Sequence, residues 1–211
     1  MLDMIKIVHV SKRFKDTVAL QDINMAFKRG LIHGIVGHNG SGKTVLFKCI
    51  CGLIEPDSGQ IIVDGKEVAP MTQQNIGAII ENPGFISSLS GFRNLKLLAS
   101  IHGHITDEQI RNTITCVGLD PLDKKKVKNY SLGMRHRLGI AQAIMENPPL
   151  LILDEPMNGL DKQGVEEIRA LFLGLKKQGK TILISSHNEE DIKVLCDTVC
   201  EMNAGVLHSI E

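Results

Sequence analysis

The segment that most constrains this chain is a glycine-rich turn between an apolar strand and a helix. Residues 37–44 read Gly-His-Asn-Gly-Ser-Gly-Lys-Thr, which matches the phosphate-loop pattern of a glycine, four variable residues and Gly-Lys-Ser/Thr. An apolar strand pattern at 31–36 precedes the turn, and a helical pattern from about Lys43 to Cys51 follows it. Glycines let backbone N–H groups turn toward phosphate oxygens, and the helix N-terminus adds positive potential. This context predicts a phosphate-binding site.

Each residue of the turn is a candidate for contact with a nucleotide. The candidates are Gly37, His38, Asn39, Gly40, Ser41, Gly42, Lys43 and Thr44. In such loops the lysine reaches the β- and γ-phosphates of ATP, so Lys43 is also a catalytic candidate, and the hydroxyl of Thr44 is expected to bind Mg²⁺. The alternative is a glycine-rich turn that holds no ligand.

A second motif ends a wholly apolar strand. The run Leu150–Leu153 is followed by Asp154 and Glu155. A buried parallel strand delivers its last residues to the carboxyl edge of the sheet, where ligands bind. Asp154 is therefore a candidate Mg²⁺ ligand, and Glu155 is a candidate general base for the attacking water. Two carboxylates in this place could instead only cap the next segment.

The rest of the chain alternates strands and helices after an early group of strands. Apolar strands at 150–153 and 181–185 alternate with helical patterns at about 162–177 and 189–196, which predicts a parallel sheet covered on both faces. Earlier strands are expected to form an antiparallel sheet beside it. A largely helical region at about 87–145 is expected as an insertion in the core, within one domain that spans residues 1–211.

Charge balance, apolar runs and cysteine spacing exclude several classes of protein. The 24 basic and 24 acidic residues cancel, so no overall field indicates nucleic acid as a partner. No apolar run approaches the roughly 18 residues of a membrane-spanning helix, and charges at Asp3 and Lys6 are unlike a signal peptide. The five cysteines lack zinc-type spacing, although Cys196 and Cys200 are spaced to share a helix face. We expect a cytoplasmic chain with reduced cysteines.

Three further sequence motifs lie around and after the apolar strand at 150–153. Residues 129–135 read Asn-Tyr-Ser-Leu-Gly-Met-Arg, residues 158–161 read Asn-Gly-Leu-Asp, and His187 follows Ser185-Ser186. Together with the two motifs above, they resemble the ABC (ATP-binding cassette) ATPases over essentially the whole chain. The resemblance implies an α/β P-loop NTPase fold with a RecA-like core, an antiparallel β subdomain and an inserted α-helical subdomain.

The resemblance also implies roles for single residues. Phe14 would stack on adenine, His187 would contact the γ-phosphate as a catalytic residue, and Ser131 and Gly133 would face ATP held by a second subunit. Each role has a plain alternative: Phe14 as a core aromatic, His187 as a surface residue, and Ser131 as a helix cap. Asp161 in the dimer-facing loop could likewise be only a helix cap.

One position departs from the usual family pattern. Where strand 76–80 meets the helical region, the family usually has glutamine, and this chain has Glu81. In having Glu81 together with the motif Tyr130-Ser131-Leu132-Gly133-Met134, the chain resembles the ATPases of bacitracin- and lantibiotic-type peptide exporters. Its charge makes Glu81 a candidate Mg²⁺ ligand, or it points into solvent. The apolar residues that follow it are expected to form either a groove for a membrane partner or part of the local core: Phe85, Ile86, Leu89 and Phe92.

The implied activity is ATP hydrolysis that powers transport through an integral membrane permease, with ATP and Mg²⁺ bound between this chain and a second nucleotide-binding domain. The protein would lie on the cytoplasmic face of the membrane. The alternatives are a soluble ABC ATPase in assembly, nucleic-acid or ribosome work, and a non-catalytic nucleotide sensor. The absence of a second cassette and of long coiled coils argues against nucleic-acid or ribosome work, whereas the sequence leaves the assembly role open. The presence of Lys43, Asp154, Glu155 and His187 argues against a non-catalytic sensor.

Overall fold

A mostly parallel six-stranded sheet forms the centre of the molecule. The computed structural model describes residues 2–69, 75–81 and 83–210. Four neighbouring pairs in this sheet are parallel, and only the edge pair β10–β9 is antiparallel. In spatial order the strands are β10 (Val206–Ser209), β9 (Thr198–Asn203), β3 (Ile32–Val36), β8 (Thr181–Ser185), β7 (Leu150–Asp154) and β6 (Ile76–Ile79).

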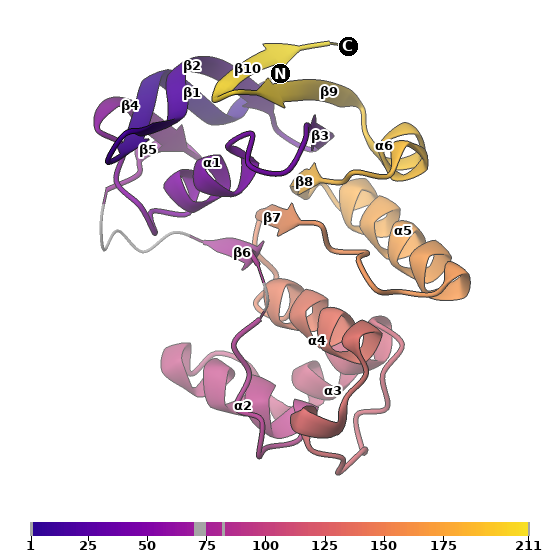
Figure 1. The fold of residues 1–211 in the computed structure, drawn as a ribbon. Helices are drawn as coiled ribbons and strands as arrows, with labels where there is room; N and C mark the ends of the chain where they lie inside the picture. The colour runs from indigo at the N-terminus through magenta and orange to yellow at the C-terminus, as the bar shows by residue number, and fades with distance from the viewer. Residues whose placement is uncertain (1, 70–74, 82, 211) are drawn as a thin grey trace.

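Helices cover both faces of this sheet, as the alternating pattern predicts. Helix α1 (Lys43–Ile50) lies on one side, and α5 (Lys162–Lys177) and α6 (Glu189–Leu195) lie on the other (Figure 1). The central strands are apolar on both faces because helices pack on each side. Strand β7, for example, is buried from Leu150 to Leu153.

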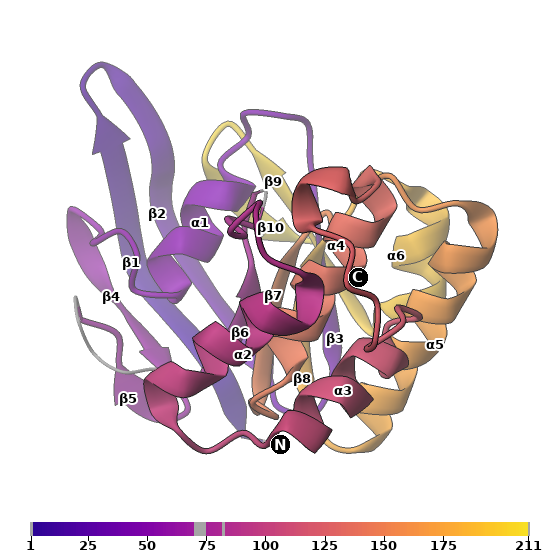
Figure 2. The same cartoon turned by 90° about the horizontal axis from the view of Figure 1, so that it is seen from below.

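A second, antiparallel sheet covers α1 on its outer side (Figure 2). Its order is β2 (Thr17–Lys28), β1 (Asp3–Phe14), β4 (Ser58–Val63) and β5 (Lys66–Glu67). Buried residues of β1, β2 and β4 share one apolar cluster with Leu46 and Phe47 of α1 and with Ile152 of β7. The phosphate-loop helix is therefore held between two sheets.

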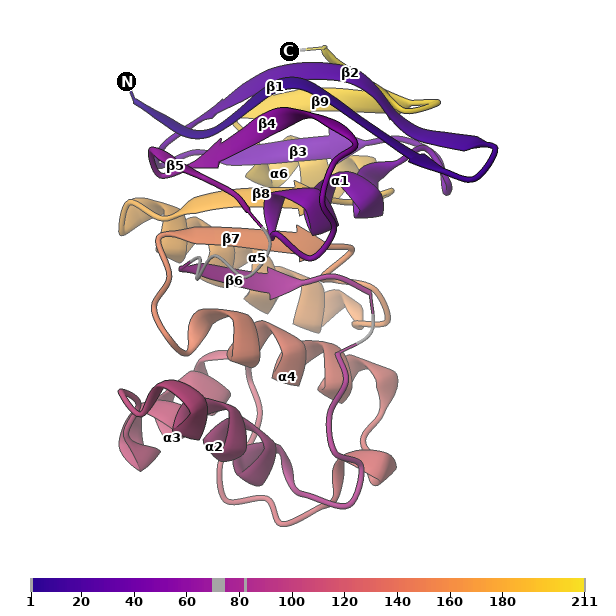
Figure 3. The ribbon, with the colours of Figure 1, turned by 90° about the vertical axis from the view of Figure 1, so that its left-hand side faces the viewer.

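The segment between β6 and β7 is helical and forms the lower part of the molecule (Figure 3). It contains α2 (Gly91–His102), α3 (Asp107–Cys116), a short 3₁₀ helix (Val127–Asn129) and α4 (Leu132–Ile144). Helix α4 packs directly on β6: a Cβ on Gly77 would lie 1.9 Å from the carbonyl oxygen of Ala143. This close contact joins the helical segment to the core.

The structure bears on three further expectations. In the described residues, no helix is both long and apolar enough to cross a bilayer. All five cysteines are free, and burial raises the pKa of Cys49 to about 11 and that of Cys51 to about 12. Such thiols are not activated nucleophiles. The prediction that Cys196 and Cys200 share a helix face was wrong. Helix α6 ends before Cys196, and Cys200 lies on strand β9.

Candidate active site

The glycine-rich turn connects β3 to α1, and its backbone passes close to other segments. Gly37 and Gly42 have φ angles of 148° and 115°. A Cβ on Gly37 would lie 2.3 Å from the carbonyl oxygen of Met202, and one on Gly42 would lie 2.5 Å from that of Ala19. Neither position has room for a side chain, so glycine is required at both.

The turn leaves donors available at the start of α1. The first N–H groups of a helix have no acceptor within the helix, and Gly42, which caps α1, makes no side-chain capping bond. The Lys43 ammonium donates to the carbonyl oxygens of Gly37 (2.6 Å) and His38 (3.1 Å). Among the described residues, the buried hydroxyl of Ser41 has no hydrogen-bond partner. These features suit an anionic ligand.

Asp154 lies at the end of β7 beside the start of α1. The Thr44 hydroxyl donates to Asp154 Oδ2 at 2.7 Å, and the Ser185 hydroxyl donates to Asp154 Oδ1 at 2.5 Å. The two candidate Mg²⁺ ligands are therefore in direct contact although they are 110 residues apart in the sequence. Both also line a pocket next to the phosphate loop, with Glu155 and with residues 17–19 of the β1–β2 hairpin.

Glu155 and His187 form a pair at the same edge of the sheet. The Glu155 carboxylate lies 2.8 Å from His187 Nδ1, and the His187 backbone N–H donates to it at 3.4 Å. Glu155 has a φ of 50° and its own N–H donates to the Ser185 hydroxyl. The His187 side chain is 69% exposed, so the imidazole is open to solvent beside Glu155.

Phe14 ends β1 and is not a core residue, since it is 45% exposed. It pairs across the hairpin with Thr17, which lines the pocket beside the phosphate loop. The Lys12 ammonium lies 5.5 Å from the centroid of its ring. An exposed aromatic beside the pocket is compatible with stacking on a base.

Ser131 and Gly133 lie at the start of α4, and neither belongs to the described residues that line the phosphate-loop pocket. Ser131 caps α4 by accepting the N–H of Met134 at 3.2 Å. Asp161 likewise caps α5 by accepting the N–H of Gly164 at 2.9 Å. The capping roles are therefore present, and Ser131 remains exposed.

Glu81 lies just after β6 with a φ of 62°. Its carboxylate pairs with the ammonium of Lys48 on α1 at 2.7 Å, and its side chain is 62% exposed. Of the apolar residues that follow, Phe85 and Phe92 pack partly against the core, and Ile86 is exposed. The set contributes both to the local core and to the surface.

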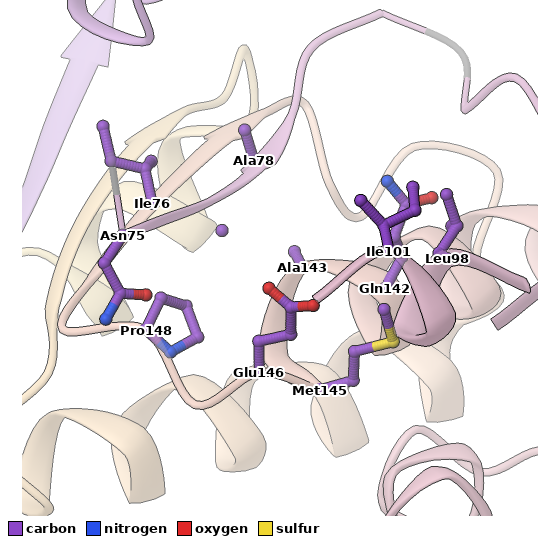
Figure 4. A pocket seen from close by; sticks show the side chains of 11 residues that line it. Asn75, Ile76, Ala78, Leu98, Ile101, Gln142, Ala143, Met145, Glu146 and Pro148 are labelled. Carbon is purple, nitrogen blue, oxygen red and sulfur yellow. The ribbon is translucent and has the colours of Figure 1, made fainter. Parts of the chain in front are cut away.

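A separate pocket lies at the amino edge of the parallel strands, opposite to the edge that carries the phosphate loop (Figure 4). Asn75 and Ile76 line it where β6 begins, Pro148 lies just before β7, and Gln142 comes from α4. The phosphate loop instead follows the carboxyl end of β3. Ligands of open parallel sheets bind at the carboxyl edge, so the pocket beside the phosphate loop is the candidate nucleotide site.

The family follows from comparison with known proteins. A family model described as "ABC transporter" matches residues 20–158, more than half of the chain. The chain belongs to the ABC transporter family. It is an ATP-binding subunit that hydrolyses ATP, and this confirms the ABC ATPase inferred from the order of the sequence motifs.

Several relatives match nearly the whole of this ABC subunit. It is 42% identical to the uncharacterized ABC transporter ATP-binding protein YybJ of Bacillus subtilis, over 99% of this chain and 96% of YybJ. It is 38% identical to the lantibiotic transport ATP-binding protein SrtF of Streptococcus pyogenes, over 93% and 85%. It is 39% identical to the bacitracin transport ATP-binding protein BcrA of Enterococcus faecalis, over 97% and 68%.

A solved structure confirms the fold class. The ATP-binding cassette MJ0796, a dimer in a post-hydrolysis state with ADP and phosphate, superimposes with a TM-score of 0.90 over 99% of both chains. Its sequence is only 22% identical. The predicted α/β P-loop fold of this ABC subunit is therefore correct.

Sequence reasoning missed two residues that contact the candidate site residues. Ser185 joins Asp154 to the backbone of Glu155, and Lys48 forms an ion pair with Glu81. The polar end of an otherwise apolar strand, Ser185-Ser186 before His187, was a usable signal for the first. Nothing in the sequence pairs Lys48 with Glu81, because their contact depends on where β6 ends relative to α1.

Proposed function

We propose that this ABC ATPase powers the export of an amphiphilic peptide, such as a peptide antibiotic, through a separate membrane permease. The observation that carries the proposal is the similarity to the lantibiotic and bacitracin transport proteins over at least 93% of the chain. Glu81 and the Tyr130–Met134 motif support the same subfamily. The subunit would act at the cytoplasmic face of the membrane.

In this proposal the described contacts change when ATP binds. The Lys43 ammonium leaves the carbonyl oxygens of Gly37 and His38 and binds the β- and γ-phosphates, where it gains a full opposite charge. The N–H groups at the start of α1 bind phosphate oxygens. Glu155 accepts a proton from the attacking water, and His187, held by Glu155, contacts the γ-phosphate. Phe14 stacks on the adenine.

Mg²⁺ fits the donor set beside the phosphate loop. The hydroxyl of Thr44 and the carboxylate of Asp154 supply the oxygen donors that this ion prefers, and phosphate oxygens and water complete such sites. When bound, the ion neutralises charge that develops on the phosphates. Thr44 and Asp154 hold each other at 2.7 Å, so the protein oxygens are already gathered.

Glu81 is proposed as a further Mg²⁺ ligand, and the substitution Glu81→Gln tests it. We expect this substitution to tighten ATP binding in chelator by about fivefold, or roughly 1 kcal/mol, because it removes a charge that repels the γ-phosphate. With Mg²⁺ it should slightly weaken ATP binding, because a charged ligand is lost. Calorimetric titration under both conditions measures the two affinities.

The control is Lys48→Gln, which breaks the 2.7 Å pair with Glu81 but leaves the glutamate in place. This variant should keep the Mg²⁺ dependence of the wild type or increase it. An identical response to Mg²⁺ in wild type and Glu81→Gln would exclude Glu81 from the metal site.

We also propose that two nucleotide-binding domains complete each other's sites. Ser131 and Gly133 begin α4 outside the described lining of this chain's phosphate-loop pocket. The N-terminus of α4, with Ser131 exposed, could therefore complete the pocket of a second subunit. Closure of such a pair on ATP, followed by reopening after hydrolysis, would move the permease.

Affinity capture from native membranes tests the transport function. We expect the tagged chain to co-purify with an integral membrane protein. After reconstitution in liposomes, bacitracin or a lantibiotic should raise ATP turnover several-fold, and the peptide should move across the bilayer only with ATP. Glu155→Gln serves as the inactive control. Capture of ribosomal particles or soluble assembly factors in place of a membrane protein would favour the alternative of a soluble ABC ATPase.

A further inference from the structure

A buried ion pair lies behind the turn that carries His187. The guanidinium of Arg169 on α5 donates to Asp191 Oδ1 on α6, from Nε at 3.0 Å and from Nη2 at 2.6 Å. The two side chains are only 5% and 4% exposed. Burial by itself would lower the pKa of Arg169, but the hydrogen bonds to Asp191 and Glu190 outweigh it and hold this pKa above its ordinary value. The two members of the pair are therefore buried together and joined by two hydrogen bonds.

The second oxygen of Asp191 extends this pair to the turn between β8 and α6. The Ser186 hydroxyl donates to Asp191 Oδ2 at 3.1 Å, and the backbone N–H of Asn188 donates to the Ser186 oxygen at 3.1 Å. Asn188 in turn caps α6 by accepting the N–H of Glu190. The residues on either side of His187 are thus both held by this network.

The turn between β8 and α6 also contacts the carboxylate of Glu155, the proposed general base. His187 contacts Glu155 through its ring Nδ1 and through its backbone N–H. Two sets of polar contacts, joined by the backbone of the turn, therefore connect α5 and α6 to Glu155. A buried ion pair contributes little net stability, because desolvation offsets most of the attraction. Its geometric effect on the turn is therefore the larger consequence.

We propose that Arg169 is a positioning residue for ATP hydrolysis, acting through Asp191 and Ser186 to hold His187 against Glu155 and the γ-phosphate. The inference rests on the proposed roles of His187 and Glu155. Arg169 itself touches neither, and its two further partners, Glu166 and Glu190, have side chains that are 70% and 71% exposed. Catalytic rates are sensitive to small displacements, since a shift of about 1 Å can cost roughly 100-fold.

The most direct test is Ser186→Ala, which removes the link to the turn and leaves the ion pair intact. We expect kcat for ATP to fall about tenfold, with an ATP dissociation constant within about twofold of wild type. Arg169→Lys keeps the charge but loses the two-point contact with Asp191. In this variant kcat should also fall, but by less than in Ser186→Ala. Glu166→Gln, which removes one exposed partner of Arg169 and leaves Asp191 in place, should leave kcat unchanged.

Combination with His187→Ala separates positioning from a general structural role. In that background Ser186→Ala should cause no further loss of kcat, because the residue that it positions is gone. An equal loss in both backgrounds, or an unchanged kcat in Ser186→Ala alone, would overturn the inference. If His187→Ala itself keeps full turnover, the proposed role of His187 fails instead, and the two failures can be told apart.

Discussion

Glu155→Gln should lower ATP turnover by at least about 100-fold while ATP binding persists. The carboxylate is the candidate base for the attacking water, and glutamine has nearly the same shape but cannot accept the proton. An amide at this position can still bond to His187 Nδ1, now 2.8 Å from the carboxylate, so the turn should stay in place. Because ATP is not consumed, the variant should accumulate as a closed dimer. Phosphate release and size-exclusion chromatography with ATP measure the two effects.

The matched control is Glu189→Gln, which removes an exposed carboxylate from the start of the neighbouring helix α6. It should turn over ATP at the wild-type rate. Near-normal turnover in Glu155→Gln would move the base to another residue, with His187 as the first candidate. A slow variant that stays monomeric with ATP would support the base role but count against the shared site.

Lys43→Ala should strongly weaken ATP binding and nearly abolish hydrolysis. The ammonium of Lys43 is buried and donates to the carbonyl oxygens of Gly37 and His38, so it is already held inside the loop that should receive the phosphates. Loss of charge-assisted bonds should weaken ATP binding by about 30-fold, or roughly 2 kcal/mol. Turnover should fall below about 1% of wild type because charge on the γ-phosphate is no longer stabilised. Binding of a fluorescent ATP analogue and phosphate release report these losses.

Lys162→Ala provides the control, because Lys162 opens α5 as Lys43 opens α1. It should bind and hydrolyse ATP normally. Thermal unfolding of Lys43→Ala shows whether the loop has collapsed, since a folded variant keeps the wild-type transition. A folded Lys43→Ala protein with unchanged ATP affinity would refute the assignment of Lys43 to the phosphates.

The sequence by itself determined the family, the fold class and the main elements. Its strongest signals were local: a phosphate loop has a fixed spacing, and buried parallel strands are apolar runs whose polar ends mark the ligand edge. Helix α5 has the predicted bounds, and β7 runs one residue past its predicted end to include Asp154. The proposed roles of Asp154 and Glu155 likewise follow from two adjacent carboxylates after four apolar residues.

Only the tertiary structure decided which of these residues meet. Thr44 and Asp154 are 110 positions apart, and Arg169 and Asp191 belong to different helices. The pairing of Glu81 with Lys48 depends on how far β6 extends beside α1. No periodicity encodes such contacts, because they depend on how strands and helices are ordered and packed around a shared core. The sequence supplied the chemical groups, and the packing of two sheets around α1 brought them to one edge.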